Sequence, residues 1–562
     1  MLLSKLNLLA TAPGGVARLR ELILTLAVQG KLVPQDPKDE PASELLKKIR
    51  AEKDRLIAEG RIKRDKPLAE IAAEEKPFGL PKGWEWSNLA TVGVINPRND
   101  ASDETIASFV EMRSIPVAFS AEHVAESRPW RDIKSGFTQF AEGDVGVAKI
   151  TPCFENGKST VFQNLSNGIG AGTTELHIVR PFGGIAPRYV LLFLKTPAFL
   201  LNGEAVMTGS AGQKRMPRDY FERTPFPLPP LAEQSRIVTR VEELMRLCDA
   251  LEAKGQLEAK QHAQLVSTLL ATLTDSETPA QLAHNWHRIA THFDLLLDRP
   301  QAVDALEQTI LQLAVRGLLV PQDPQDEPAS ELLKKIRAEK DKLIAEGKIK
   351  RDKPLPPIVD VMNPCDLPKG WAWMRFSELG NFCGGKTPST QRSSYWDGEF
   401  PWITPKDMKQ SLLSDSEDKV TRAALDDGLA LIPLRSVLIV VRSGILRRTL
   451  PTAINLVETT INQDLKALVL VRPELANYVQ LLIQGFEGFI LENLTKIGTT
   501  VESMQFEAFA AQPFPLPPLA EQSRIVTRVA QLRRLCAVLR QRLTASQSTQ
   551  AHLAEALVEN VA

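Results

Sequence analysis

The spacing of apolar residues predicts two helices near the start of the chain. One apolar set recurs every three or four residues, which is the pattern of an amphipathic helix, and consists of Val16, Leu19, Ile23, Leu24 and Ala27. Gly30 follows as a helix stop, and Pro34 and Pro37 interrupt regular structure beyond it. Pro41 suits the first turn of a second helix that ends at Gly60. That helix carries Leu45, Ile49, Leu56 and Ile57 on one side.

A four-three spacing of apolar residues predicts two much longer helices with heptad seams. The seam residues are Ile237, Val241, Leu244, Cys248 and Leu251 in one helix and Ile525, Val529, Leu532, Cys536 and Leu539 in the other. Continued in strict heptads, the seam would take in His262 and Gln550, then Leu265 with Leu269 and Leu553 with Leu557. We expect a coiled coil. The alternative is a helix with one apolar face against a globular core.

These helices belong to a long internal duplication. Residues 26–68 and 313–355 differ at only five of 43 positions: Gln29/Arg316, Lys31/Leu318, Lys38/Gln325, Arg55/Lys342 and Arg61/Lys348. A second block, PFPLPPLAEQSRIVTRV, is identical at Pro225–Val241 and Pro513–Val529. The two pairs of blocks are offset by 287 and 288 residues, but the segments between the blocks share little sequence. The duplicated blocks, here called the frame, are nearly identical, but the inserts that they enclose differ. This arrangement indicates one scaffold that presents two different recognition segments.

The inserts, here called the variable segments, predict mixed α/β structure. Both open with LPKGW-x-W, at Leu80–Trp86 and Leu367–Trp373, where alternating tryptophans suit a strand with one buried face. Val145–Ile150 and Val437–Val441 are typical of core strands. The fold class is therefore α/β, with two mixed α/β domains separated by two long helices in a pseudo-twofold repeat. The predicted domains are a helical region 1–75, a variable segment 76–224, a central region 225–362, a second variable segment 363–512 and a long helix 513–562.

Composition narrows the class of protein. The chain has 562 residues, with 43% hydrophobic and 24% charged residues, as in soluble proteins with several domains. No apolar run is long enough to cross a bilayer, and the five cysteines form no CxxC pair, which favours a reducing cytoplasm. The formal net charge is zero. That balance weighs against a chain that grips DNA alone, but not against one that supplies part of a larger grip.

Three patterns resemble catalytic or metal-binding motifs, but each lacks the flanking residues or partner ligands that such a site requires. Gly380–Thr387 fits the phosphate-loop pattern GxxxxGK[ST] and would make Lys386 the key residue of a stand-alone NTPase, but Pro388 and a polar run replace the helix that a phosphate loop requires. His284, His287 and His292 lack convergent partners for a metal. Asp407–Lys409 matches only the end of a nuclease motif. The absence of catalytic motifs in so long a chain favours binding over catalysis.

The variable segments do carry side chains suited to reading DNA. Arg and Lys reach guanine edges or phosphates, and Asn and Gln reach adenine. The candidates in the first segment are Lys149, Asn156, Lys158, Gln213, Lys214 and Arg215. Those in the second are Lys386, Thr387, Lys406, Lys409, Arg442 and Lys496. The alternative for each residue is a solvated surface position.

The sequence resembles the specificity subunits of type I restriction–modification systems. The resemblance covers essentially the whole length. It rests on the duplicated frame, on the PLPPLAEQ motif before each long helix, on the LPKGW-x-W openings, and on two motif sets inside the inserts. These sets are GFTQF at Gly136–Phe140 with AKITPCFENGK at Ala148–Lys158, and GGKTPST at Gly384–Thr390 with YWDG-x-FPWITPKDMK at Tyr395–Lys409. The chain departs from the family in one respect. Many members begin close to the first recognition domain, whereas here about 75 residues of frame precede the first insert. This difference changes where the repeat is cut but not the order of its parts.

The resemblance implies a non-catalytic subunit in which each variable segment reads one half of an asymmetric, divided double-stranded DNA site. The long helices would pack antiparallel and set the distance between the two readers. Two modification subunits, which use S-adenosylmethionine to methylate adenine N6, would dock on the frame. Restriction subunits using ATP and Mg²⁺ would join them, and this chain itself would bind no cofactor. A coiled-coil scaffold without DNA readout remains an alternative.

Overall fold

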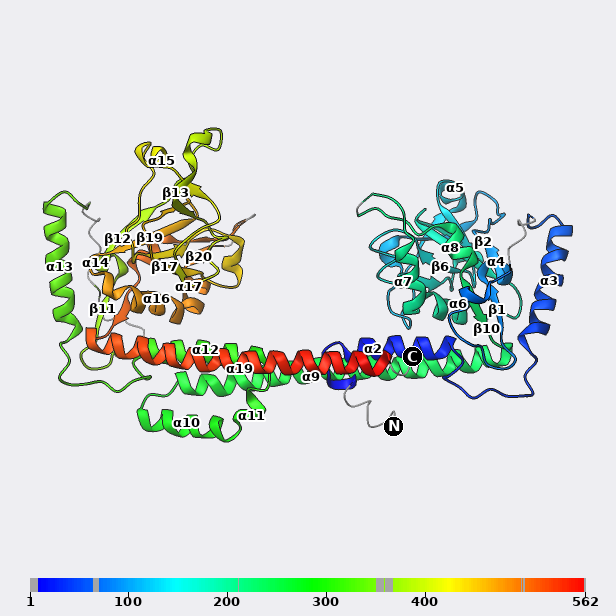
Figure 1. Cartoon of the computed structure of the whole chain (residues 1–562), viewed down its shortest axis with the longest axis horizontal. Helices are drawn as coiled ribbons and strands as arrows, with labels where there is room; N and C mark the ends of the chain where they lie inside the picture. Colours follow the sequence, from blue (N-terminus) through cyan, green and yellow to red (C-terminus); the bar gives the residue numbers. More distant parts are fainter. Residues whose placement is uncertain are drawn as a thin grey trace. The chain divides into compact units, whose positions relative to one another are not determined.

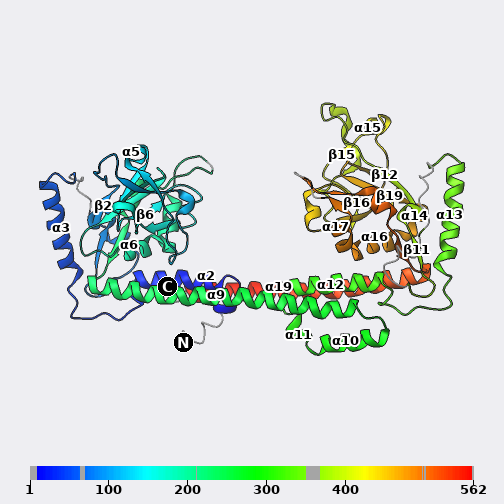
Figure 2. The ribbon, with the colours of Figure 1, turned by 180° about the vertical axis from the view of Figure 1, so that it is seen from behind.

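The computed structural model describes residues 9–63, 70–210, 212–349, 358, 367–496, 498 and 501–559. The chain forms two compact units: unit 1 is Met1–Ala259 with Ser546–Ala562, and unit 2 is Lys260–Ala545. Each unit holds one copy of the frame and one variable segment (Figures 1 and 2).

The predicted helices of the frame are present in both copies. They are α2 (Gly15–Val28), α3 (Ala42–Ala58), α12 (Pro300–Val315), α13 (Ala329–Ala345) and the long helices α9 (Leu231–Thr274) and α19 (Leu519–Glu559). Gly30 and Gly60 end α2 and α3 with positive φ angles of 69° and 70°, a conformation that glycine adopts without steric cost. The segment between the repeats, residues 275–301, has no clear counterpart elsewhere in the sequence over its first half and contains α10 (Pro279–Thr291) and α11 (Phe293–Leu296).

Each unit contains the start of one long helix and the end of the other, the combination expected of an antiparallel pair. In unit 1, Ile237 and Val241 of α9 share a hydrophobic core with Ile23 of α2 and with Ala554 near the end of α19. In unit 2, the core joins Ile525 and Val529 of α19 to α12 and to residues near the end of α9. The seam therefore packs into a globular core as well as along the helices.

The strict heptad prediction is confirmed for the first turns of the seam and is met only in part beyond them. Ile237, Val241, Cys248, Ile525, Val529 and Cys536 are buried, and Leu244, Leu532 and Leu539 are half-buried. Leu251 is instead 37% exposed, and Leu265, Gln550 and Leu553 are exposed. The residues buried in place of the exposed heptad positions are Met245, Val266, Leu270, Leu273 and Ala554, and the predicted His262, Leu269 and Leu557 are half-buried. The buried set advances about one residue past the heptad register because an α-helix has 3.6 rather than 3.5 residues per turn.

The first variable segment contains two four-stranded sheets. One has the order β2-β9-β6-β7, formed by Gly93–Ile95, Leu176–Pro181, Val145–Ala148 and Ser159–Val161. The other has the order β4-β3-β8-β5, formed by Glu126–Pro129, Ile106–Val110, Ile169–Gly172 and Thr138–Ala141. The rings of Phe140 and Phe162 stack at 3.6 Å. A Cβ atom on Gly170 would lie 2.4 Å from the Phe140 ring, which explains the glycine there.

Short helices complete this segment. They are α4 (Leu89–Val92), α5 (Trp130–Ile133), α6 (Pro187–Leu194), α7 (Pro197–Ala205) and α8 (Arg218–Arg223). All residues of α6 from Tyr189 to Leu194 are buried, so this helix forms the centre of the unit 1 core.

The second variable segment is built from a five-stranded sheet and a three-stranded sheet. The first has the order β12-β19-β16-β17-β14, formed by Gly380–Gly384, Leu465–Leu470, Val437–Val440, Thr452–Asn455 and Leu412–Leu413. The second has the order β15-β13-β18, formed by Lys419–Val420, Trp396–Ile403 and Thr460–Ile461. The helices are α14 (Phe376–Leu379), α15 (Arg422–Asp426), α16 (Ala476–Gly485), α17 (Glu487–Asn493) and α18 (Phe506–Ala511).

The same two-stranded ladder closes both segments. β1 (Glu85–Asn88) pairs antiparallel with β10 (Pro225–Leu228), and β11 (Ala372–Met374) pairs with β22 (Phe514–Leu516). The core strands predicted at Val145–Ile150 and Val437–Val441 are confirmed as β6 and β16, and the α/β fold class is confirmed. In the described part of the chain, no helix is long and apolar enough to cross a membrane.

Candidate nucleic-acid interface

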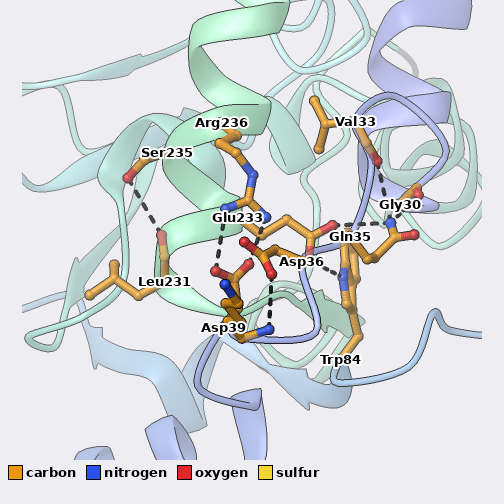
Figure 3. A network of polar contacts seen from close by, with 11 residues as sticks. Gly30, Val33, Gln35, Asp36, Asp39, Trp84, Leu231, Glu233, Ser235 and Arg236 are labelled. Atoms are coloured by element: carbon orange, nitrogen blue, oxygen red, sulfur yellow. Dashed lines mark hydrogen bonds and ion pairs between the residues drawn. The ribbon is translucent and has the colours of Figure 1, made fainter.

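A polar network around a buried carboxylate joins the two duplicated blocks of the frame in unit 1, and we call it the polar clasp (Figure 3). Its members are Gln35, Asp39, Trp84, Glu233 and Arg236. The Glu233 carboxylate accepts hydrogen bonds from Trp84 Nε1 at 2.9 Å and from Gln35 Nε2 at 3.1 Å. Arg236 lies 2.6 Å from Asp39. The clasp therefore joins the Pro-rich turn, the first residues of the variable segment and the start of α9.

Unit 2 contains the same clasp. Trp371 Nε1 donates to Glu521 at 3.0 Å, Gln322 Nε2 donates to the same carboxylate at 3.4 Å, and Arg524 lies 2.6 Å from Asp326. All five positions are copied in the sequence, but the sequence pattern predicted a role only for Trp84 and Trp371, as residues on the buried face of a strand. Both tryptophans are buried, but they lie directly before β1 and β11. The signal that could have revealed the clasp is polar residues copied without change between blocks far apart in the chain.

Burial shapes the electrostatics of the clasp. Glu233 and Glu521 are each 1% exposed, and this desolvation raises the pKa of both carboxyl groups. The hydrogen bonds from tryptophan and glutamine act in the opposite direction. A buried carboxylate is stable only when donors satisfy it, so the centre of each clasp is a fixed joint, while Gln35 and Gln322 at its edge are exposed.

In unit 1 the structure brings the two predicted recognition loops together. Thr151 N donates to Lys214 O at 3.0 Å, and Lys214 N donates to Thr151 Oγ1 at 3.1 Å. Met216 N donates to Lys149 O at 2.7 Å. The loop that carries Asn156 and the loop that carries Gln213 and Lys214 therefore form one surface. Asn156, Gln213 and Lys214 are exposed on it, and Lys149 is half-buried.

Two predicted contacts of this surface already have partners within the chain. Lys158 Nζ donates to Met112 O at 2.8 Å, and Arg215 forms an ion pair with Glu175 at 2.8 Å. The hydrogen bond from Arg215 lowers the pKa of the Glu175 carboxyl. DNA contacts by Lys158 and Arg215 would have to compete with these bonds. The sequence could not show these partners, because residue spacing does not reveal a contact with a distant segment of the chain; the DNA contacts of Lys158 and Arg215 stay predictions.

In unit 2 four of the predicted residues surround the ends of neighbouring strands. Lys386 N donates to Ile461 O at 3.1 Å, and Thr387 is hydrogen-bonded to Gln463. Arg442 forms an isolated bridge with Ser503, which pairs with Lys496 in the β20–β21 ladder (Thr495–Lys496 and Ser503–Met504). The side chains of Lys386, Arg442 and Lys496 are exposed.

The remaining two candidates follow β13. Lys406 lies 3.9 Å from Glu417 and 3.8 Å from Asp418, so its charge is partly balanced within the chain. Lys409 is exposed. The DNA contacts of these and the other candidates stay predictions.

The phosphate-loop alternative is wrong. Gly380–Gly384 is strand β12, paired with β19 rather than folded as a loop. A Cβ atom on Gly385 would lie 2.1 Å from Ile461 O, so this glycine serves close backbone packing. The residues after Thr387 do not form a helix that could hold a phosphate. In the described residues no group of three His, Cys, Asp or Glu side chains is placed to hold a metal ion.

A short hairpin is shared by both variable segments, although their sequences differ. Thr208 pairs with Arg215 in unit 1, and Lys496 pairs with Ser503 in unit 2, with the same separation. Each hairpin also bridges to the residues after the equivalent core strand, through Ile150 in unit 1 and Arg442 in unit 2. The two candidate surfaces thus share a backbone plan and differ in side chains.

A duplicated frame that displays two dissimilar loop surfaces defines a recognition protein. A model of the type I restriction modification DNA specificity domain matches residues 368–545. The chain is 45% identical over 566 residues to the type I restriction enzyme EcoAI specificity subunit of Escherichia coli, covering 97% of this chain and 93% of that protein. It is 44% identical over 561 residues to the EcoEI specificity subunit of the same organism, covering 97% and 93%.

The chain therefore belongs to the family of type I restriction enzyme specificity subunits. A solved structure describing complex assembly and conformational transition of the type I R-M system contains a chain with the same fold, at a TM-score of 0.52 and 19% identity. That match covers 86% of this chain and 99% of the other. Membership in this family supports a non-catalytic role.

Proposed function

We propose that this chain selects the DNA sequence for a type I restriction–modification complex, with each variable segment reading one half of an asymmetric, divided site. The observation that carries the proposal is the clasp in each unit, the same in residues and bonding, holding a different exposed loop surface. The same clasp in both units, combined with different exposed side chains in the two variable segments, suits a DNA target whose two halves differ in sequence.

The proposal assigns catalysis to partner subunits. Two modification subunits bind S-adenosylmethionine and methylate adenine, and restriction subunits use ATP and Mg²⁺ to translocate and cleave DNA. The formal net charge of zero supports this division, because phosphate contacts dominate affinity for DNA and basic partner surfaces can supply them. Since the proposed substrate is genomic DNA, the complex works in the cytoplasm.

Exchanging variable segments tests the proposal. Residues 76–224 are replaced by residues 363–512 in the full chain, and the reconstituted methyltransferase complex is used to methylate a random DNA library. We expect the methylated site to become symmetric, with the second half-site read twice. An unchanged asymmetric site would contradict the proposal.

A second experiment distinguishes DNA recognition by this chain from a purely scaffolding role. Alanine substitutions of Lys214, Lys386 and Arg442 remove exposed cations outside the clasp. We expect weaker DNA binding by a complex that still assembles. Full binding after all three substitutions would favour a scaffold whose DNA contacts lie in other subunits.

A further inference from the structure

One buried lysine in the first variable segment has no carboxylate partner among the described residues. Lys195 follows directly after α6 and is 7% exposed. Its Nζ donates to Val117 O at 2.7 Å and to Gly157 O at 2.9 Å. Burial, assisted by Arg188, lowers the pKa of the Lys195 ammonium to about 7. Burial costs the amine its hydration, and the hydrogen bonds to the two carbonyls offset part of that cost.

One of those carbonyls, Gly157 O, belongs to the candidate surface, and the other, Val117 O, belongs to a neighbouring segment. Gly157 closes the loop from Thr151 that carries Asn156, and its positive φ of 68° makes the turn. Val117 belongs to the neighbouring segment, where Arg188 of α6 also stacks over Phe119 at 4.4 Å. The start and the end of α6 therefore both hold this segment against the core.

The second variable segment uses a neutral side chain for the same task. Gln480 of α16 is 8% exposed, and its Nε2 donates to Ser411 O at 2.9 Å and to Thr452 O at 3.0 Å. Ser411 lies two residues after the exposed Lys409. In both segments a buried polar side chain, directly after α6 in the first and within α16 in the second, donates to backbone carbonyls of two separate strands or loops.

We propose that Lys195 is a positioning residue for the first half-site, and that Gln480 is its counterpart for the second. This proposal rests on the proposed function, because it concerns how each segment aims its loops at DNA. Neither side chain is placed to touch DNA. Each one fixes the backbone from which the exposed residues reach a base edge, where small displacements break the geometry of base contacts.

The test uses the full chain in the reconstituted methyltransferase complex. Competition binding compares the cognate duplex with duplexes that carry one mismatch in either half-site. Lys195→Met keeps most of the side-chain stem but removes the donors. We expect it to reduce discrimination in the first half-site at least tenfold and to leave the second half-site unchanged. Gln480→Leu should give the reciprocal result.

Lys195→Arg separates positioning from simple destabilisation. Arginine retains donors for the two carbonyls, so discrimination should be closer to wild type than in Lys195→Met when both variants melt at the same temperature. Equal loss of discrimination in Lys195→Arg and Lys195→Met would overturn the proposal, and so would a folded Lys195→Met complex with wild-type discrimination. A wild-type complex without any bipartite preference would instead reject the proposed function itself.

Discussion

Glu233 of the polar clasp is the residue whose removal gives the sharpest energetic test of the frame. Glu233→Ala eliminates two hydrogen bonds to a carboxylate, at 2.9 and 3.1 Å, and leaves Trp84 Nε1 buried without an acceptor. Hydrogen bonds to charged groups contribute about 1.5–3 kcal/mol each, so the gross loss is about 3–6 kcal/mol. Relief of the desolvation that raises the pKa of Glu233 offsets part of this loss. We therefore expect a net loss of about 2–4 kcal/mol.

Glu521→Ala is the matched substitution in unit 2. Its second hydrogen bond, from Gln322, is longer at 3.4 Å, so the expected loss is about 1 kcal/mol smaller. Hydrogen exchange followed by mass spectrometry measures the free energy of local opening in peptides that contain Gln35 or Gln322. The Glu233 substitution should deprotect the first peptide and the Glu521 substitution the second.

Glu243→Ala provides the control on the same helix. Glu243 forms an exposed ion pair with Arg240 at 3.0 Å, and such pairs contribute about 0–1 kcal/mol. A Glu233→Ala protein whose protection matches that of Glu243→Ala would refute the reasoning, since the clasp would then contribute no more than a surface pair. Deprotection spread evenly over both units would refute the claim that each clasp acts locally.

Three further substitutions probe the variable segments. Asp144→Ala removes a buried carboxylate that is paired with the half-buried Arg180 at 2.8 Å, so urea unfolding should show a loss of about 1–3 kcal/mol. Asp103→Ala removes an exposed ion pair with Lys134 and should cost under about 1 kcal/mol. Burial lowers the pKa of His177 from 6.5 to about 4, so the folded state resists protonation and unit 1 should lose up to about 3 kcal/mol as the pH falls from about 6.5 to 4. His177→Gln should flatten that pH dependence. Lys386→Ala should reduce the salt dependence of DNA binding by about one unit of slope if the lysine holds a phosphate.

The frame was predictable from the sequence because its information is local. Apolar spacing located α2 and α3, and Gly30 and Gly60 marked their ends. The buried face of the two long helices was harder to predict from the sequence. Strict heptads predicted Leu265, but Val266 is buried instead, because small differences in helical period accumulate over many turns. Pattern alone therefore locates a long helix better than it locates the distant end of its buried face.

The candidate site was predictable only in part, because its geometry depends on contacts between distant segments. Residue type and loop context identified Asn156, Gln213 and Lys214, and the structure joins their loops. The same criteria could not foresee that Arg215 is paired with Glu175, 40 residues earlier. Nor could they identify Lys195, since a lysine beside an apolar helix is expected to reach solvent.

The two-stranded ladders β1–β10 and β11–β22 explain how one frame can carry two variable segments of different sequence. In both segments the strand after LPKGW pairs with the strand that contains FPLPP, with Trp86 opposite Pro227 and Trp373 opposite Pro515. The chain thus enters and leaves each insert at neighbouring positions, and the clasp locks that junction to the start of a long helix. An insert that keeps its two terminal strands can change its interior without disturbing the frame. Sequence divergence is therefore tolerated between these two terminal strands, where the exposed amides and cations of both loop surfaces lie.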